Sequence, residues 1–244
     1  MEENFGKDYE NFYQSSWWFR VREKIILKEV RSRLKGHSNQ ILDVGCGNGL
    51  LFSKLEKFGQ VAGIETDTKL LDPNSKHFKN IGTQPLGDSR YKKESQDLIL
   101  ALDVVEHIED DTKAFNDIFD LLKPGGTLIL TVPAFQMLWS EHDVLNHHFR
   151  RYTLDQIRGR AEKFEIEKSQ YFFALLFPIK WLLVHLRLPG RRQIRQDKIR
   201  LPLIEKVLEI YFIFEFQLLR WMPLPFGSSI LLIGTKKDLN RNNE

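Results

Sequence analysis

The chain has 244 residues, of which 42% are hydrophobic and 28% charged, and its formal net charge is +3. This length suits one domain with its own core and, at most, a sizeable insertion. The small net charge gives no global sign of nucleic-acid binding, and the single cysteine, Cys46, excludes an internal disulfide and a cysteine-based metal site.

The sequence shows no targeting or membrane-spanning segment. Acidic residues dominate the first ten positions, which is the wrong charge for a signal peptide. The longest apolar candidate, residues 171–188, is interrupted by Pro178 and by charged side chains. We therefore expect a cytoplasmic protein, and the lone Cys46 fits a reducing compartment.

Residues 8–35 predict a helix, because aromatic and aliphatic residues recur at mostly helical spacing between lysines and arginines. Gly36 is a plausible C-cap, so residues 1–37 form a helical leader before the first strand. The leader either packs over the edge of a sheet or points Arg20 or Arg22 toward a bound ligand.

A glycine-rich junction follows, and the rest of the chain is organised around it. An apolar strand reaches Asp43, continues into Gly45, Gly47 and Gly49, and gives way to an apolar helix pattern. Backbone N–H groups at such a junction can hold a polar or anionic ligand. The spacing differs from the dinucleotide fingerprint, because Leu50 stands where that motif has its last glycine.

Strand-like and helix-like segments alternate beyond this junction. We expect strands at 40–44, 60–65, 81–86, 96–102 and 127–132, helices at 50–58 and 114–122, and a further helix near Pro73. The alternation predicts a parallel sheet with helices on both faces. Ligands of such sheets bind beyond the carboxyl ends of the strands.

Acidic residues stand at three of these strand ends. Glu65 follows the glycine loop by about twenty residues, the distance at which a carboxylate accepts hydrogen bonds from ribose hydroxyls. Asp88 can accept an adenine amino proton, and Asp103 follows the fourth strand. The competing interpretations are a solvent-exposed or capping acid for Glu65 and a turn aspartate for Asp88.

These landmarks, in this order, resemble the class I S-adenosylmethionine-dependent methyltransferases. The run from Asp43 to Gly49 resembles the first motif of that family, and the Lys-Pro-Gly-Gly turn at 123–126 resembles the turn before its fifth strand. The resemblance covers residues 41–132. It implies a seven-stranded sheet with an antiparallel seventh strand, and S-adenosyl-L-methionine as methyl donor.

The resemblance also implies which residues contact the cofactor. They are Asp43, Gly45, Cys46, Gly47, Asn48, Gly49, Glu65, Thr66, Asp88, Ser89, Leu102, Asp103 and, from the leader, Arg22. Leu102 and Asp103 would border the methionine part. Glu106 and His107 come next, and we expect them either to cap and pack a helix or to join the site.

Residues 132–153 follow the fifth strand and are crowded with titratable and aromatic side chains, as in a substrate-binding loop. They resemble a bacterial methyltransferase subgroup of type 11/12. The matching positions are Trp139, Asp143, His148, Arg150, Arg151 and Tyr152.

A hydroxyl or amine acceptor must lose a proton, and histidine titrates near neutrality. The predicted catalytic set is therefore His148, His147 and His142, with Asp143 and Tyr152. The histidines lack a metal-ligand spacing along a helix, so no metal is expected. The alternative is that these groups only hold the loop together.

Residues 164–173 and 228–236 predict the last two strands, with an insertion between them. The insertion is apolar over 174–188 and again over 203–221. Between these stretches it is basic, with Arg191, Arg192, Arg195, Lys198 and Arg200. Apolar faces beside a basic cluster suit a membrane surface. The alternative is a helical cap packed on the sheet.

We expect an α/β fold: a Rossmann-like seven-stranded mostly parallel sheet with helices on both faces. The chain divides into a leader (1–37), a cofactor-binding core (38–173), a helical insertion or lid (174–227) and a last strand with its tail (228–244). The predicted function is methyl transfer to a small or lipid-linked acceptor, in the cytoplasm or on the inner membrane face. The alternative is a non-catalytic S-adenosylmethionine- or nucleoside-binding regulatory module.

Overall fold

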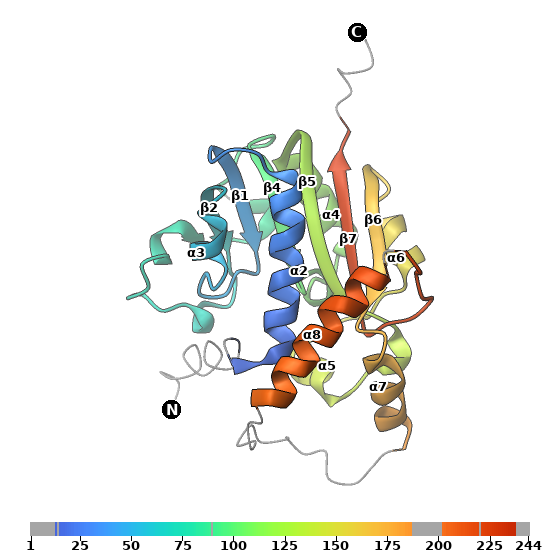
Figure 1. Cartoon of the computed structure of the whole chain (residues 1–244). Helices are drawn as coiled ribbons and strands as arrows, with labels where there is room; N and C mark the ends of the chain where they lie inside the picture. The colour runs from blue at the N-terminus through green and yellow to red at the C-terminus, as the bar shows by residue number, and fades with distance from the viewer. Residues whose placement is uncertain (1–12, 14, 89, 187–201, 220, 238–244) are drawn as a thin grey trace.

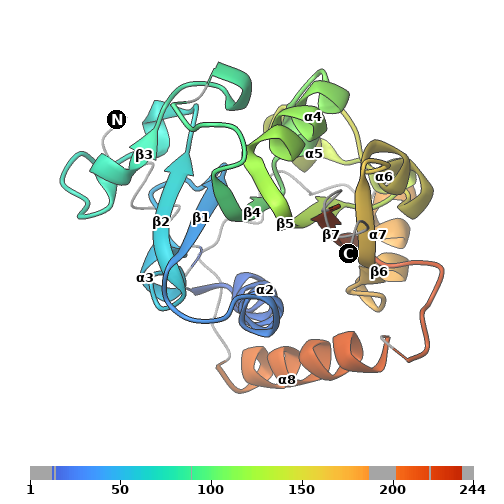
Figure 2. The same cartoon turned by 90° about the horizontal axis from the view of Figure 1, so that it is seen from above.

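A computed structural model of the chain describes residues 13, 15–88, 90–186, 202–219 and 221–237. One sheet runs through it in the order β3-β2-β1-β4-β5-β7-β6, with helices on both faces (Figures 1 and 2). Its strands are β1 (Asn39–Val44), β2 (Gly59–Ile64), β3 (Ile81–Gly82), β4 (Gln96–Leu102), β5 (Leu122–Pro133), β6 (Phe164–Phe172) and β7 (Ser229–Lys236). Strand β7 is antiparallel to both neighbours and the other pairs are parallel, which confirms the expected sheet.

The helices form two layers around this sheet (Figure 2). One layer holds α2 (Trp17–Arg33), α3 (Phe52–Leu55) and α8 (Pro202–Leu218), and the other holds α4 (Asp111–Leu121) and α6 (Leu154–Arg160). Alternate residues of β4 feed the two cores: Leu98 and Leu100 pack toward α2, whereas Ile99 packs toward α4. This alternation buries both faces of the strand.

Two short helices lie beyond the carboxyl ends of the parallel strands. They are α5 (Glu141–Leu145), in the loop after β5, and α7 (Leu176–His185), which follows β6. Figure 1 shows both below the sheet, at the end where the parallel arrows point. In the described part of the chain, no helix combines the length and apolarity that crossing a membrane requires.

The connections depart from the predicted elements. The expected helix near Pro73 was wrong: the segment forms 3₁₀ turns at Thr68–Leu70 and Phe78–Asn80. Between these turns the Asp72 carboxylate accepts a hydrogen bond from the Asn74 N–H (2.9 Å), a local bond that competes with helix formation. The helix expected at 50–58 is reduced to α3, and the third strand has only two residues.

The leader packs against the second helix of the insertion. Arg20 forms ion pairs with Glu205 (2.7 Å) and Glu209 (2.5 Å) of α8, and the Trp17 ring stacks on Phe212 at 5.1 Å. These contacts give Arg20 a structural role. Arg22, on the same helix, lies in the cleft described below. The helix ends with a cap at Leu34 and not at Gly36.

Candidate active site

A cleft of about 1220 Å³ opens at the carboxyl ends of the parallel strands. It is bordered by the glycine loop, the end of β2, the connections after β4 and β5, and helices α2 and α7. The predicted site residues that line it are Arg22, Asp43, Gly45, Cys46, Gly47, Glu65, Thr66, Leu102, Asp103, His142, His147 and His148. Residues about 125 positions apart in the sequence, such as Arg22 and His148, thus share one cavity.

The glycine loop is held against the sheet by the Gly45 N–H, which donates to the Ile64 carbonyl at 2.8 Å. Gly45 has φ +67°, and an added Cβ would stand 2.4 Å from Cγ2 of Val104, so only glycine fits there. Gly47 also has positive φ (+53°), but a Cβ there would meet no atom within 4 Å. The loop therefore leaves open space on its cleft side, as a bound nucleoside or methionine group requires.

Two carboxyl groups lie beside this loop. The Glu65 carboxylate accepts hydrogen bonds from the N–H groups of Gly47 and Asp67, both at 2.9 Å, and its oxygens have further lone pairs for ligand hydroxyls. Burial raises the pKa of Glu65. Burial and the Glu65 charge raise the pKa of Asp43 to about 7, so this carboxyl can donate as well as accept near neutrality.

Several predicted cofactor residues lie elsewhere. The Asn48 amide oxygen accepts from the Asp72 N–H at 3.1 Å, which ties the loop to the following turn. Gly49 packs beside Phe52 and His77. Asp88 is exposed and is not among the cleft-lining residues, and the predicted Ser89 lies outside the described residues. Cys46 does line the cleft, but it is buried, burial raises the pKa of its thiol, and its sulfur fills the space beside Gly63.

Arg22 crosses from the leader helix to the end of β4. It forms an ion pair with Asp103, donates to Oγ1 of Thr131 at 2.6 Å and lies over the Trp18 ring at 4.3 Å. Asp103 has φ +56°, a strained backbone for a non-glycine residue. The leader thereby places a buried cation at the cleft, and contact of Arg22 with a bound ligand stays a prediction.

Asp143 is the centre of the acceptor side. Its fully buried carboxylate accepts two hydrogen bonds from Arg151 (2.8 and 3.0 Å), one from Nδ1 of His148 (2.9 Å) and one from the Ser140 N–H (2.8 Å). Burial alone would raise the pKa of Asp143, but the bonds from His148 and Arg151 hold it well below its usual range.

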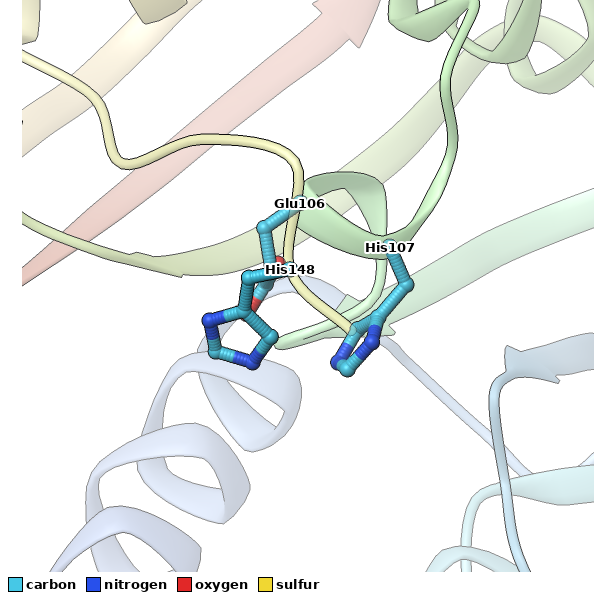
Figure 3. Close-up of side chains that lie close together, drawn as sticks. All are labelled: Glu106, His107 and His148. Carbon is cyan, nitrogen blue, oxygen red and sulfur yellow. The ribbon is translucent and has the colours of Figure 1, made fainter. Parts of the chain in front are cut away.

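The Asp143 carboxylate fixes the His148 tautomer. An ionised carboxylate only accepts hydrogen bonds, so Nδ1 carries the proton and Nε2 is left to accept one. The His107 ring packs edge-on against His148, with ring centroids 4.5 Å apart. Figure 3 shows His107 and Glu106 projecting from the connection after β4 and His148 approaching them from the loop after α5.

Glu106 is a residue whose role the sequence left open. It is fully buried, and within the described residues neither carboxylate oxygen has a hydrogen-bond partner. Burial and the charge of Asp103 raise its pKa well above the usual value. Glu106, His107 and His148 each offer a ligand atom within 4.8 Å of the others, so they could hold a divalent cation.

The remaining predicted catalytic residues differ in where they lie. His142 and His147 are exposed at the rim of the cleft. Tyr152 is buried in the core, and its hydroxyl donates to Oδ2 of Asp111 at 3.0 Å. Burial and Asp111 raise the pKa of Tyr152, so the phenol stays protonated, and its side chain is not among those that line the cleft. Lys180 of α7 lines the cleft and had not been predicted.

Known proteins match the chain in sequence. A methyltransferase-domain family model matches residues 42–130. A ubiquinone biosynthesis O-methyltransferase of Coxiella burnetii (strain Dugway 5J108-111) is 27% identical over 157 residues, which cover 62% of this chain and 58% of that protein. The corresponding protein of Xanthomonas axonopodis pv. citri is 28% identical over 159 residues, covering 54% and 66%. The chain thus matches less than two thirds of the length of these curated relatives.

Solved structures match in fold. An S-adenosylmethionine-dependent methyltransferase from Archaeoglobus fulgidus has a TM-score of 0.60 at 14% identity, covering 95% of this chain and all of that one (100%). Geranyl diphosphate C-methyltransferase from Streptomyces coelicolor A3(2) has a TM-score of 0.57 at 13% identity, covering 88% and 79%. Residues 42–130 therefore carry a methyltransferase domain, and the strand order is that of the class I S-adenosylmethionine-dependent methyltransferases.

Proposed function

We propose that the chain transfers the methyl group of S-adenosylmethionine to a hydroxyl oxygen of a lipid-linked acceptor. The observation that carries the proposal is the His148–Asp143 pair, because His148 lines the same cleft as the glycine loop and the buried Asp143 holds its ring. The curated relatives support an oxygen acceptor and a lipid-like molecule, since they are named ubiquinone biosynthesis O-methyltransferases. A structure of the same fold contains geranyl diphosphate.

The cofactor half of the proposal rests on the β1 and β2 ends. The open space at Gly47 would admit the methionine and ribose parts, and Glu65 would accept hydrogen bonds from the ribose hydroxyls. Arg22 lines the cleft, and its guanidinium would suit the cofactor carboxylate. When bound, the cofactor supplies an electrophilic methyl group on a positively charged sulfur.

The acceptor half rests on proton transfer. The acceptor oxygen forms a bond to the methyl carbon while the carbon–sulfur bond breaks, and that electron pair stays on sulfur. The hydroxyl proton passes to Nε2 of His148, and the imidazolium that results is stabilised by Asp143 through Nδ1–H. Arg151 keeps Asp143 ionised for this role. Holding the acceptor in line with the methyl group supplies much of the remaining rate.

The proposed function is tested by incubating the full chain with methyl-labelled S-adenosylmethionine and a panel of phenolic lipids. We expect label in the lipid and one S-adenosylhomocysteine released for each methyl transferred. Cofactor binding without transfer to any phenol, alcohol or amine in the panel would instead support the non-catalytic binding module.

Replacing Glu65 by glutamine should weaken S-adenosylhomocysteine binding by a factor of about 10–100. A hydrogen bond to a charged group contributes about 1.5–3 kcal/mol, and the neutral amide loses that charge at the proposed ribose contact. Isothermal titration calorimetry measures the dissociation constant. Asp67→Asn is the control, because Asp67 is an exposed cap two residues away. Equal affinities of wild type and Glu65→Gln would contradict the ribose contact.

We also propose that α7 and α8 place the protein on an anionic membrane surface. Both helices expose apolar stripes to solvent, made of Leu175, Ile179, Leu182 and Leu186 along α7 and of Leu203, Val207, Ile210 and Phe214 along α8. The five basic residues of 191–200 come between these helices in the sequence, outside the described residues. Apolar side chains with basic neighbours favour interfacial binding.

Flotation with vesicles tests this surface. The wild type should float with vesicles that contain anionic lipid, and the double substitution Ile210→Ser, Phe214→Ser should abolish flotation, since burial of each side chain is worth about 1.5–3 kcal/mol. Replacing the five basic residues of 191–200 by glutamine should restrict binding to low salt or abolish it. Phe78→Ser, at an exposed aromatic outside the insertion, is the matched control. A wild type that stays unbound at low salt would refute the proposal.

A further inference from the structure

Helix α7 has two different faces. Its outer face carries the exposed apolar stripe, and its inner face packs over the short turn Gln136–Leu138. There the Phe177 ring meets Phe135 at 5.2 Å and Phe226 at 5.4 Å. Lys180 stands one turn further along this inner side and reaches the lining of the cleft.

Lys180 lies among other charges without pairing with any of them. The side chain is half-buried, and in the described part of the chain it forms no hydrogen bond or ion pair. Burial, and then the charges of Arg151 and Arg22, lower its pKa to about 8, whereas Asp143 and Asp103 act in the opposite direction. At pH 7 the amine is still mostly protonated, so the cleft contains a desolvated cation.

The neighbouring charges do not neutralise this cation. Arg22 is paired with Asp103 and Arg151 is paired with Asp143, which leaves each of these pairs neutral. Among the described residues, Lys180 is therefore left without a carboxylate partner at this end of the cleft, and a partly buried charge without a partner costs free energy until an anion arrives.

We infer that Lys180 binds an oxyanion, a carboxylate or a phosphate, that is carried by the acceptor. This step rests on the proposed function, because it assigns the anion to the molecule that is methylated. Its position supports that assignment: Lys180 is close enough to Arg151 and Asp143 to interact electrostatically, and Asp143 holds His148. Anchoring the anion would orient the acceptor hydroxyl toward Nε2 of His148.

The anion site can be tested without turnover. Lysines of the full chain are reductively methylated with ¹³C-formaldehyde, and Lys180→Met identifies the Lys180 signal. With S-adenosylhomocysteine saturating and ionic strength fixed by chloride, addition of inorganic phosphate or of acetate should shift this signal and raise its apparent pKa. The signal of Lys69, an exposed lysine also lining the cleft, should not move. A response to only one anion identifies the group that is bound.

Two results would overturn the inference. A Lys180 signal that titrates identically in chloride, phosphate and acetate excludes an anion site. A response that disappears when S-adenosylhomocysteine is present assigns the site to the cofactor carboxylate and not to the acceptor. Neither result depends on whether methyl transfer occurs, so failure of this inference can be told from failure of the proposed function.

Steady-state kinetics provide a second test of the anion site once an acceptor is known. Lys180→Met should raise KM for an anionic acceptor by a factor of about 10–100, as expected for loss of one charged hydrogen bond, and change KM for its uncharged ester less than threefold. Lys180→Arg should restore most of the affinity, and Lys79→Met, at an exposed lysine outside the cleft lining, should match wild type. Equal effects on the acid and its ester would contradict the inference.

Discussion

Replacing His148 by asparagine should lower the turnover number of methyl transfer by a factor of about 10²–10⁴. The asparagine side chain keeps an N–H near the position of Nδ1, so the buried Asp143 carboxylate retains its partner. The substitution removes Nε2, the nitrogen that takes the proton from the acceptor hydroxyl. Steady-state kinetics at saturating acceptor should therefore show a lower kcat, while the affinity for S-adenosylhomocysteine stays within about twofold of wild type.

The matched control is His147→Asn. His147 is exposed at the cleft rim with φ +55°, a conformation that asparagine also tolerates, so this variant should keep the wild-type turnover number within about threefold. If His148→Asn also retained wild-type turnover, His148 would not be the base. A variant of His107 would then be the next to examine, because the two rings are in contact.

Replacing Asp143 by asparagine should lower the free energy of unfolding by about 3–5 kcal/mol. Arg151 is only 7% exposed, and the substitution leaves its guanidinium buried opposite a neutral amide. Urea unfolding of both proteins at pH 7 measures the difference. Asp120→Asn removes the exposed ion pair with Lys93 and should leave the free energy of unfolding close to that of the wild type. A cost for Asp143→Asn as small as that of Asp120→Asn would contradict the central role of this carboxylate.

The pH dependence of this effect has a definite sign. The pKa of Asp143 is lower in the folded protein than in the unfolded chain, where aspartate titrates near about 3.9. Its stabilisation is therefore complete above that unfolded value and is lost as the pH falls toward the folded one. The difference in unfolding free energy between wild type and Asp143→Asn should stay constant from pH 7 to about pH 5 and shrink below about pH 4.

The sequence could predict the sheet because its signals are local. The apolar run of β4 and the glycine-rich junction after β1 each specify their own segment. The carboxyl ends of parallel strands then bring Asp43, Glu65 and Asp103 to one edge of the sheet without further information. The segment after β2 was mispredicted because Asp72 forms a side-chain hydrogen bond that an apolar pattern does not encode.

For the acceptor side, the sequence could predict which types of residue are present but not how they are arranged. The loop after β5 changes direction at Phe135 and His147, which both have positive φ although neither is glycine. No local sequence pattern predicts these conformations. Because the loop turns at these two residues, His148 lies close to Glu106 and Tyr152 is buried in the core. The sequence did not predict Lys180 as a site residue, because a single lysine within an apolar segment indicates only a break in the apolar pattern. The structure shows that Lys180 of α7 lines the cleft.

The packing of the leader on α8 sets a practical limit on where the chain can be cut. A fragment that begins at β1 contains the whole segment matched by the family model, but it lacks α2. It would expose the apolar side chains that α2 covers, among them Phe172 and Phe212, and it would leave Glu209 without its two cationic partners. It would also remove Arg22 from the cleft. A fragment that keeps both the packing of α2 on α8 and Arg22 in the cleft therefore has to begin before Trp17.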